Sequence, residues 1–224
     1  MHAIVPPAPS PCSQSSAASE SSVCASTALP IKLEQLISVF HAVFFEPFNT
    51  QLIAHGQETL YSPATPSQPA KIIFSHDYFA SALHEVAHWC VAGAERRKLE
   101  DYGYWYAPDG RSEDQQKEFE RVEVRPQALE WIFSVAAGQP FRVSADNLAQ
   151  GLGPSRAFKQ AICEQAQVFC REGLPPRPAM FVKALEQAFG QSHTLNPTHY
   201  AGEHVEQAFS QHSLRPQACL SAFT

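Results

Sequence analysis

Residues 78–94 constrain the fold more than any other segment, because they combine a helical apolar stripe with two regularly spaced histidines. Apolar side chains recur there at three- and four-residue steps, so the segment is expected to be a helix that packs on a core. His84 and His88 are four residues apart and project from one helical face, within reach of a single metal ion. The fold must therefore bury this helix and bring a third ligand to its histidines from elsewhere in the chain.

Together with Glu85, the two histidines form the pattern H-E-x-x-H, in which metalloproteases use the glutamate as a general base. Glu85 lies at the rim of the histidine face, where it can reach a metal-bound water. With 10 His in 224 residues, the pattern should arise by chance only about 0.03 times. A metal site is therefore predicted, and the ordinary alternative is two hydrogen-bonded histidines on a helix surface.

The third ligand is expected from the carboxylates of the next predicted helix, which are Glu118, Glu120, Glu123 and Glu130. Glu123 is favoured because valines flank it, and a carboxylate among apolar neighbours is costly unless it is paired or binds a cation. Glu118 and Glu120 lie in a polar run and are expected to be solvated. A salt bridge from Glu123 to Arg121 or Arg125 is the alternative. Two histidines and one carboxylate serve both non-haem iron(II) oxygenases and zinc sites, and the motif does not separate them.

Composition and periodicity divide the rest of the chain into three parts. Residues 1–29 are rich in Ser, Ala and Pro, lack aromatic residues and show no period, so we expect a disordered extension. Residues 30–190 are expected to form a single domain. Residues 191–224 are rich in His and Gln and are expected to be a weakly structured tail.

Helical periodicity within the domain covers about residues 30–47, 78–94, 112–137, 157–170 and 177–189. A short β-type run covers residues 71–74, and an aromatic β-prone run covers 102–106. We therefore expect a helix-dominated α+β fold with a few short strands. Pro126 lies inside the third helical pattern and is expected to kink or split that helix.

Charge and hydropathy exclude several classes of protein. The formal net charge is -6, from 16 Lys+Arg and 22 Asp+Glu, which argues against a broad basic face that binds nucleic acid. No apolar run approaches the roughly 20 residues that a membrane span needs. Residues 1–10 carry no Lys or Arg ahead of an apolar stretch, so no signal peptide is expected. We expect a cytoplasmic protein whose 6 cysteines, none in a C-x-x-C pair, are reduced.

Three separated blocks resemble the elongation factor P hydroxylase family. They are FASALHEVAHWC at 79–90, GYWYAPDGR at 103–111 and VEVRPQALEW at 122–131. The similarity extends from about Leu33 to Phe189 and leaves both ends of the chain outside. Bacterial enzymes of this family hydroxylate the β-lysyl-modified lysine of elongation factor P, so the resemblance implies that activity and that protein partner.

The resemblance further implies a zincin-like domain in which His84, His88 and Glu123 hold the metal. Iron(II) with dioxygen as co-substrate is the expected chemistry, and zinc or another divalent metal can occupy the site in isolated protein. Glu85 would then orient a ligand or handle protons. No H-x-D pattern followed by a distant histidine is visible on predicted strands, so no motif supports 2-oxoglutarate dependence. A zinc-dependent metallopeptidase that uses Glu85 as its base is the alternative function.

The predicted substrate contacts are His76, Tyr104, Trp105 and Asp109. The aromatic run can wall a pocket and grip an alkyl stem, although aromatic residues in a β-type run are also common core residues. Asp101 and Asp109 are expected to receive the ammonium groups of a modified lysine. His76 and Asp77 precede the motif helix and are expected to support the metal ligands, unless they only form a turn. Because this chain and elongation factor P are both acidic, we expect weak and transient docking.

Overall fold

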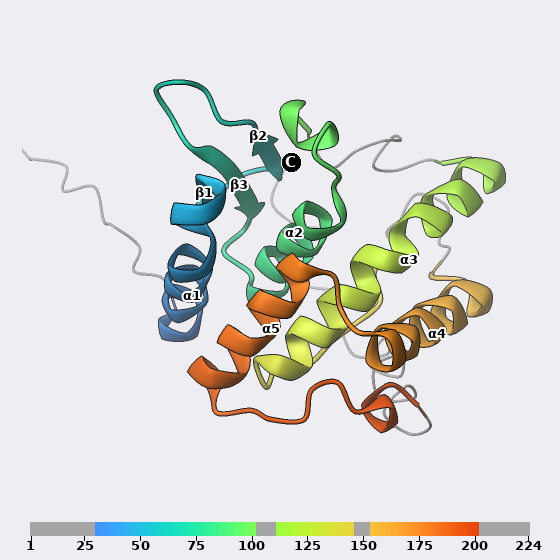
Figure 1. Ribbon diagram of the computed structural model, residues 1–224. Coiled ribbons are helices and arrows are strands. Elements are labelled where there is room, and N and C mark those ends of the chain that lie inside the picture. The colour runs from blue at the N-terminus through green and yellow to red at the C-terminus, as the bar shows by residue number, and fades with distance from the viewer. Residues whose placement is uncertain (1–29, 102–110, 146–152, 202–224) are drawn as a thin grey trace, which may run out of the picture.

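The computed structural model describes residues 30–101, 111–145 and 153–201, which form helices packed around a small sheet (Figure 1). The helices are α1 (Ile31–Phe48), α2 (Phe79–Val91), α3 (Glu113–Ala136), α4 (Arg156–Glu172) and α5 (Pro176–Phe189). The strands are β1 (Thr50–Gly56), β2 (Leu60–Ser62) and β3 (Ala70–Ser75), and η1 (Arg96–Lys98) and η3 (Pro197–Tyr200) are short 3-10 helices. The predicted helix-dominated α+β class is confirmed. Residues 1–29 and 102–106, for which we predicted disorder and a β-type run, lie outside the described residues.

The sheet has the order β1-β3-β2, with β3 parallel to β1 and antiparallel to β2. Alternate side chains of β3 are buried, namely Ala70, Ile72 and Phe74, as expected for a strand with one face on a core. α1 packs on β1, and α2 packs on β3. The sheet thereby holds the motif helix in place.

Aromatic side chains join α1, α2 and α5 into one core. α1 buries one residue per turn, and these are Leu33, Leu36, Phe40 and Phe44. The ring centroid of Phe44 lies 4.9 Å from that of Trp89 on α2 and 5.7 Å from that of Phe181 on α5. Because Trp89 directly follows His88 in the chain, this packing fixes the rotation of α2 about its axis.

α3 is a single helix of 24 residues that crosses the molecule between α2, α4 and α5 (Figure 1). It begins with a capping box, in which the Ser112 hydroxyl accepts a hydrogen bond from Gln115 N and the Gln115 side chain accepts one from Ser112 N. Pro126 lies inside the helix and does not split it. Residues 126–134 are all buried, so this part of α3 is the centre of the domain.

The packed region extends beyond the predicted boundary at residue 190. Tyr200 in η3 is fully buried, and its hydroxyl donates a hydrogen bond to Thr194 O at 2.9 Å. Its ring lies 5.2 Å from that of Trp131 on α3. The expectation of a weakly structured tail is therefore wrong for residues 191–201, where one large buried side chain anchors a segment without a periodic pattern.

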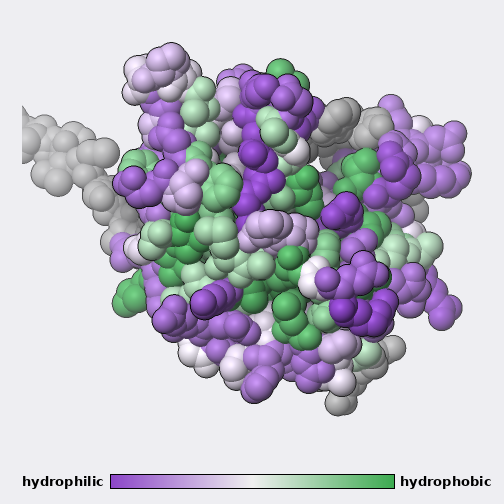
Figure 2. Space-filling model, viewed as in Figure 1, coloured by the Kyte–Doolittle hydropathy of each residue, from purple (hydrophilic) through white to green (hydrophobic). Residues whose placement is uncertain are grey.

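The surface is mixed in character. On the face shown in Figure 2, hydrophobic side chains gather near the centre and hydrophilic ones surround them. Among the described helices, none has both the length and the apolar composition required to cross a bilayer.

Candidate metal centre

The two histidines of α2 face each other on the side of the helix that turns toward α3. α2 buries Leu83, Val86 and Ala87 on its other side, which leaves His84 and His88 only partly covered. Their ring centroids are 4.6 Å apart, and their Nε2 atoms are 3.0 Å apart. The four-residue spacing thus places two imidazole nitrogens at one point, as predicted from the sequence.

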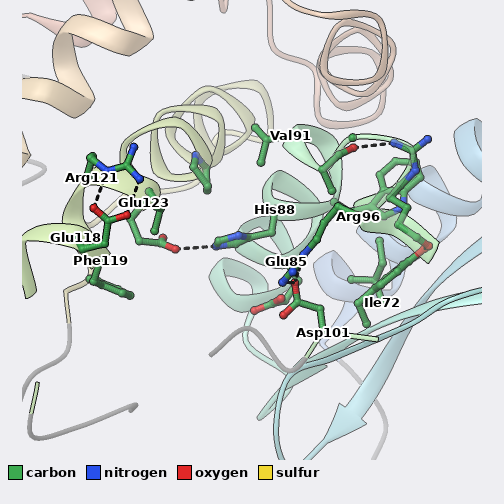
Figure 3. A pocket seen from close by; sticks show the side chains of 17 residues that line it. Ile72, Glu85, His88, Val91, Arg96, Asp101, Glu118, Phe119, Arg121 and Glu123 are labelled. Atoms are coloured by element: carbon green, nitrogen blue, oxygen red, sulfur yellow. Dashed lines mark hydrogen bonds and ion pairs between the residues drawn. The ribbon is translucent and has the colours of Figure 1, made fainter. Parts of the chain in front are cut away.

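Glu123 on α3 reaches the same point from the opposite side. Its Oε1 lies 3.2 Å from His88 Nε2, and its Oε2 lies 3.7 Å from His84 Nε2. Figure 3 shows the Glu123 carboxylate directed at the His88 ring. The three side chains offer ligand atoms that all lie within 4.8 Å of one another. Of the four candidate carboxylates, the structure brings this one to both Nε2 atoms.

This donor set fits a divalent metal ion. Ligand atoms at ~2.1 Å from one ion are ~3 Å apart when they subtend ~90° at the ion. The observed separations of 3.0, 3.2 and 3.7 Å between the donor atoms are close to that value. Three donors on one side of an ion leave further coordination positions open, and this His, His, carboxylate set suits iron(II) as well as zinc.

Glu130 orients the ring of His84. The Nδ1 atom of His84 donates a hydrogen bond to Glu130 Oε2 at 2.8 Å, and Glu130 is buried. When neutral, His84 with its proton on Nδ1 has a lone pair on Nε2, which points toward His88 and Glu123. A carboxylate that holds the second nitrogen of a histidine is a regular partner of metal-binding imidazoles. Glu130 therefore supports a possible ligand, whereas the sequence had suggested it only as a ligand.

Gln127 supports Glu123 in a similar way. Its Nε2 donates hydrogen bonds to Glu123 Oε2 at 3.4 Å and to Ser144 O at 2.6 Å, and its Oε1 accepts one from Ser144 N at 3.1 Å. Glu123, Gln127 and Glu130 follow the spacing i, i+4, i+7 of one helical face. That spacing is the sequence signal that could have identified Gln127, which we did not predict.

The electrostatics of the metal-free group favour a protonated His84 and an ionised Glu123. Burial alone would lower the pKa of His84, but the hydrogen bond to Glu130 and the charges of the nearby carboxylates raise it to about 10. Burial would raise the pKa of Glu123, but the charge and hydrogen bond of His88 lower it to about 2. A metal ion that binds here must displace the proton of His84.

A cavity of about 480 Å³ opens beside the metal centre, where the C-terminal half of α2 faces α3 (Figure 3). Its lining includes Tyr61, Ile72, Glu85, His88, Trp89, Val91, Arg96, Asp101, Glu118, Phe119, Arg121, Val122, Glu123 and Pro126. Glu85 is half-buried in this wall. Burial raises the pKa of Glu85, although the charges of His84 and His88 oppose this shift. The cavity gives a substrate access to His88 and Glu123.

The other candidate carboxylates have different roles. Glu118 binds Arg121 on the surface of α3, with Arg121 Nε 2.7 Å from Glu118 Oε2. Glu120 accepts a hydrogen bond from the Ser155 hydroxyl at 2.6 Å and so holds the start of α4. Neither belongs to the histidine group. Arg121 is thus engaged by Glu118, and among the described residues Glu123 forms no salt bridge to an arginine.

The predicted contacts ahead of α2 do not join the metal centre. The His76 ring stacks on Tyr78 with a centroid distance of 5.9 Å, and His76 is not among the residues that line the cavity. Asp77 accepts hydrogen bonds from His55 N at 2.6 Å and His55 Nδ1 at 2.7 Å. The turn after β3 directs both side chains to β1 and the surface, so their predicted support of the metal ligands is wrong.

The remaining predicted substrate contacts, Tyr104, Trp105 and Asp109, lie outside the described residues. Asp101 does line the cavity, but Arg96 holds its carboxylate, with Nη2 donating to Oδ2 at 2.6 Å. Of the two acids that we expected to receive an ammonium group, Asp101 therefore lies at the cavity, and its carboxylate is already in an ion pair.

Comparison with known proteins identifies relatives of most of the described region. Residues 39–200 match the family model described as elongation factor P hydroxylase. Over 166 residues the chain is 49% identical to the elongation factor P lysine hydroxylase of Haemophilus influenzae, and the alignment covers 74% of this chain and 93% of that relative. His84, His88, Glu123 and Glu130 all lie within the matched segment.

Proposed function

The chain belongs to the elongation factor P hydroxylase family, and on that premise we propose that it hydroxylates a lysine side chain of elongation factor P. The observation that carries the proposal is the position of His84, His88 and Glu123 at the wall of a cavity. These residues lie in the segment shared with a relative that is named as a lysine hydroxylase. The β-lysyl-modified lysine is the form of the substrate that we propose.

In this proposal, His84, His88 and Glu123 hold iron(II). When bound, the iron supplies the redox chemistry by which dioxygen hydroxylates an aliphatic carbon of the substrate. The donor set also accepts zinc, so isolated protein can carry another divalent metal. We infer a zincin-like arrangement of the motif helix, and the packing of α2 on β3 supports this. No 2-oxoglutarate motif accompanies the site.

The protein side chains position the reactants. Glu130 holds the His84 ring through Nδ1, and Gln127 holds the Glu123 carboxylate. Both contacts fix donor atoms before a substrate arrives, which avoids the cost of ordering them during the reaction. Glu85 contacts a ligand or transfers protons at the cavity wall, and burial of the walls excludes part of the bulk water.

Elongation factor P is the proposed protein partner, and the loop that carries the lysine would enter the cavity. The net charge of -6 gives this chain no long-range attraction to an acidic factor. We therefore expect recognition to be concentrated on the inserted side chain, without direct contact to nucleic acid or membrane. Because the substrate is a translation factor, we propose that the reaction takes place in the cytoplasm. Tyr104, Trp105 and Asp109 stay proposed contacts of the inserted loop.

The test is an assay with purified modified elongation factor P, iron(II), a reductant and air. Peptide mapping should find additional oxygen on the modified lysine, and factor that lacks the modification should react much less. His88→Ala protein should be inactive, because it lacks one metal ligand. Cleavage of the factor by zinc-loaded protein, without added oxygen, would contradict the proposal and favour the metallopeptidase alternative.

A further inference from the structure

The cavity contains one carboxylate without a partner. Four carboxylates line it, and these are Glu85, Asp101, Glu118 and Glu123. Within residues 30–101, 111–145 and 153–201, Glu85 makes no hydrogen bond and no ion pair through its side chain. Glu85 is half-buried, and a carboxylate in such a place is costly unless a cation or a donor compensates it. The nearby histidines His84 and His88 act on Glu85 through their charge, but no donor in the described part of the chain makes a hydrogen bond to its carboxylate.

The other three carboxylates are already compensated. Arg96 Nη2 donates to Asp101 at 2.6 Å. Arg121 Nε donates to Glu118 at 2.7 Å. Glu123 belongs to the metal centre. Of the four carboxylates, Glu85 is therefore the one whose side-chain oxygens can still accept hydrogen bonds from a cationic ligand in the cavity.

The arginines of the wall are engaged as well. Arg96 and Arg121 bind the carboxylates just described, and Arg97 Nη1 donates to the carbonyl oxygen of Ala92 at 2.7 Å. These contacts hold the three guanidinium groups in the wall of the cavity. Figure 3 shows Glu85 on α2 close to His88, and Glu123 on α3 with its carboxylate directed at the His88 ring.

We propose that Glu85 is the binding subsite for the ammonium group of the substrate lysine. This inference rests on the proposed function and adds the group that selects the substrate. Glu85 and His88 are three residues apart on α2, so their Cβ atoms are ~5–6 Å apart. An ammonium group at Glu85 therefore leaves the methylene groups of its own chain beside His88. The subsite both selects a cationic side chain and places aliphatic carbon at the metal centre.

The walls suit the alkyl part of such a ligand. Trp89, Phe119 and Val122 present apolar surface to the cavity. A cavity of about 480 Å³ falls within the usual range for small ligands of ~300–1,000 Å³. The chemical class that fits is a protonated primary amine at the end of a flexible alkyl chain. This assigns the ammonium group to Glu85 rather than to Asp101, whose charge Arg96 already balances.

The test compares two small probes of similar size, n-pentylammonium and 1-pentanol, with full-length zinc-loaded protein. Titration followed by NMR should show that the wild-type protein prefers the ammonium ion. In Glu85→Gln this binding should weaken about tenfold or more, because a charged hydrogen bond is lost, whereas pentanol binding should not change. Glu172→Gln is the matched control, since it removes the same charge from an exposed carboxylate outside the cavity, and its ammonium binding should equal that of wild type.

Several results would overturn the subsite. They are unchanged ammonium binding in Glu85→Gln, an equal loss for both probes, or an equal loss in Glu172→Gln. Glu85→Asp keeps the charge and should retain more of the preference than Glu85→Gln. If that variant instead loses as much, the carboxylate charge is not the determinant. Zinc content is measured for each protein, so that loss of metal is distinguished from loss of the amine site.

The binding test separates this inference from the proposed function. Hydroxylation of elongation factor P by a protein whose amine preference is independent of Glu85 would overturn the subsite alone. Amine binding through Glu85 in a protein that adds no oxygen to elongation factor P would overturn the proposed function alone.

Discussion

The carboxylate of Glu130 accepts a hydrogen bond from Nδ1 of His84 at 2.8 Å. Glu130 follows Glu123 by seven residues on α3, so both side chains face α2. α3 therefore carries both the carboxylate that lies beside the two Nε2 atoms, Glu123, and the carboxylate that orients the His84 ring, Glu130. Since Glu130 is buried, its contact with His84 is shielded from competing water.

Removal of the hydrogen bond between His84 and Glu130 should lower the affinity for metal without removing a metal ligand. Glu130→Ala should lower metal affinity about 10- to 100-fold, as expected for loss of the group that orients a metal-bound histidine. Glu130→Gln keeps an acceptor for His84 Nδ1 and should lose less. Competition with a chromophoric chelator measures both. Equal affinity in wild type and Glu130→Ala would show that the hydrogen bond does not support the site.

The assignment of the third ligand can be tested with a set of carboxylate variants. Glu123→Ala should lose metal as completely as His88→Ala, because each removes one of three donors. Glu118→Ala and Glu120→Ala should retain it. Elemental analysis of the purified proteins decides the matter, and metal loss confined to Glu118→Ala or Glu120→Ala would contradict the assignment. Glu120→Ala should instead lower the free energy of unfolding by about 1 kcal/mol, because Ser155 loses its acceptor.

Metal binding at neutral pH should release a proton. The pKa of His84 is raised to about 10 in the metal-free protein, so the ring is protonated at pH 7 and must become neutral to bind a metal. Calorimetric titration in buffers with different ionisation enthalpies measures this release as a slope. A slope of zero would mean that His84 is neutral before metal binds.

The raised pKa of His84 also predicts how the stability of the metal-free protein depends on pH. Because the pKa of His84 is higher in the folded than in the unfolded chain, its contribution is fully present below about 6.5 and is lost as pH rises to about 10. Urea unfolding of chelator-treated protein between pH 6 and pH 10 should show this decline. His84→Ala protein should show a smaller decline, and an identical profile in both proteins would contradict the expectation.

Tyr200 should contribute to the core although it lies beyond the predicted domain boundary. Tyr200→Ala removes a fully buried ring that contacts Trp131 and should lower the free energy of unfolding by about 3 kcal/mol. Leu195→Ala, at a site that is 37% exposed, should cost less than about 1 kcal/mol. Urea denaturation measures both, and equal small effects would show that residues 191–201 are not part of the cooperative fold.

The motif helix and its two histidines could be predicted because all the information is local. Apolar spacing defines α2, and His84 and His88 need only helical geometry to meet. The start of α3 was equally predictable, since Ser112 and Gln115 form a capping box within one turn. Glu123 stood out through its apolar neighbours, and the structure brings it to the two histidines.

Features that depend on contacts between distant residues were not predictable in this way. β1 pairs directly with β3, although β2 and a loop separate these two strands in the sequence, and the apolar run of β1 is short. Pro126 removes one hydrogen bond from α3, at the carbonyl of Val122. Val122 is 40% exposed, so water can reach that side of the helix and the helix continues. The contact of Glu130 with His84 likewise depends on how α3 lies against α2.

The most direct test of the account is the origin of the oxygen atom in the product. Iron-loaded protein is incubated with modified elongation factor P and a reductant under isotopically labelled dioxygen, and the intact mass of the factor is measured. The account predicts one labelled oxygen atom per factor, with none in Glu123→Ala or His88→Ala protein. An unchanged mass, an oxygen atom derived from water, or fragments of the factor would contradict it.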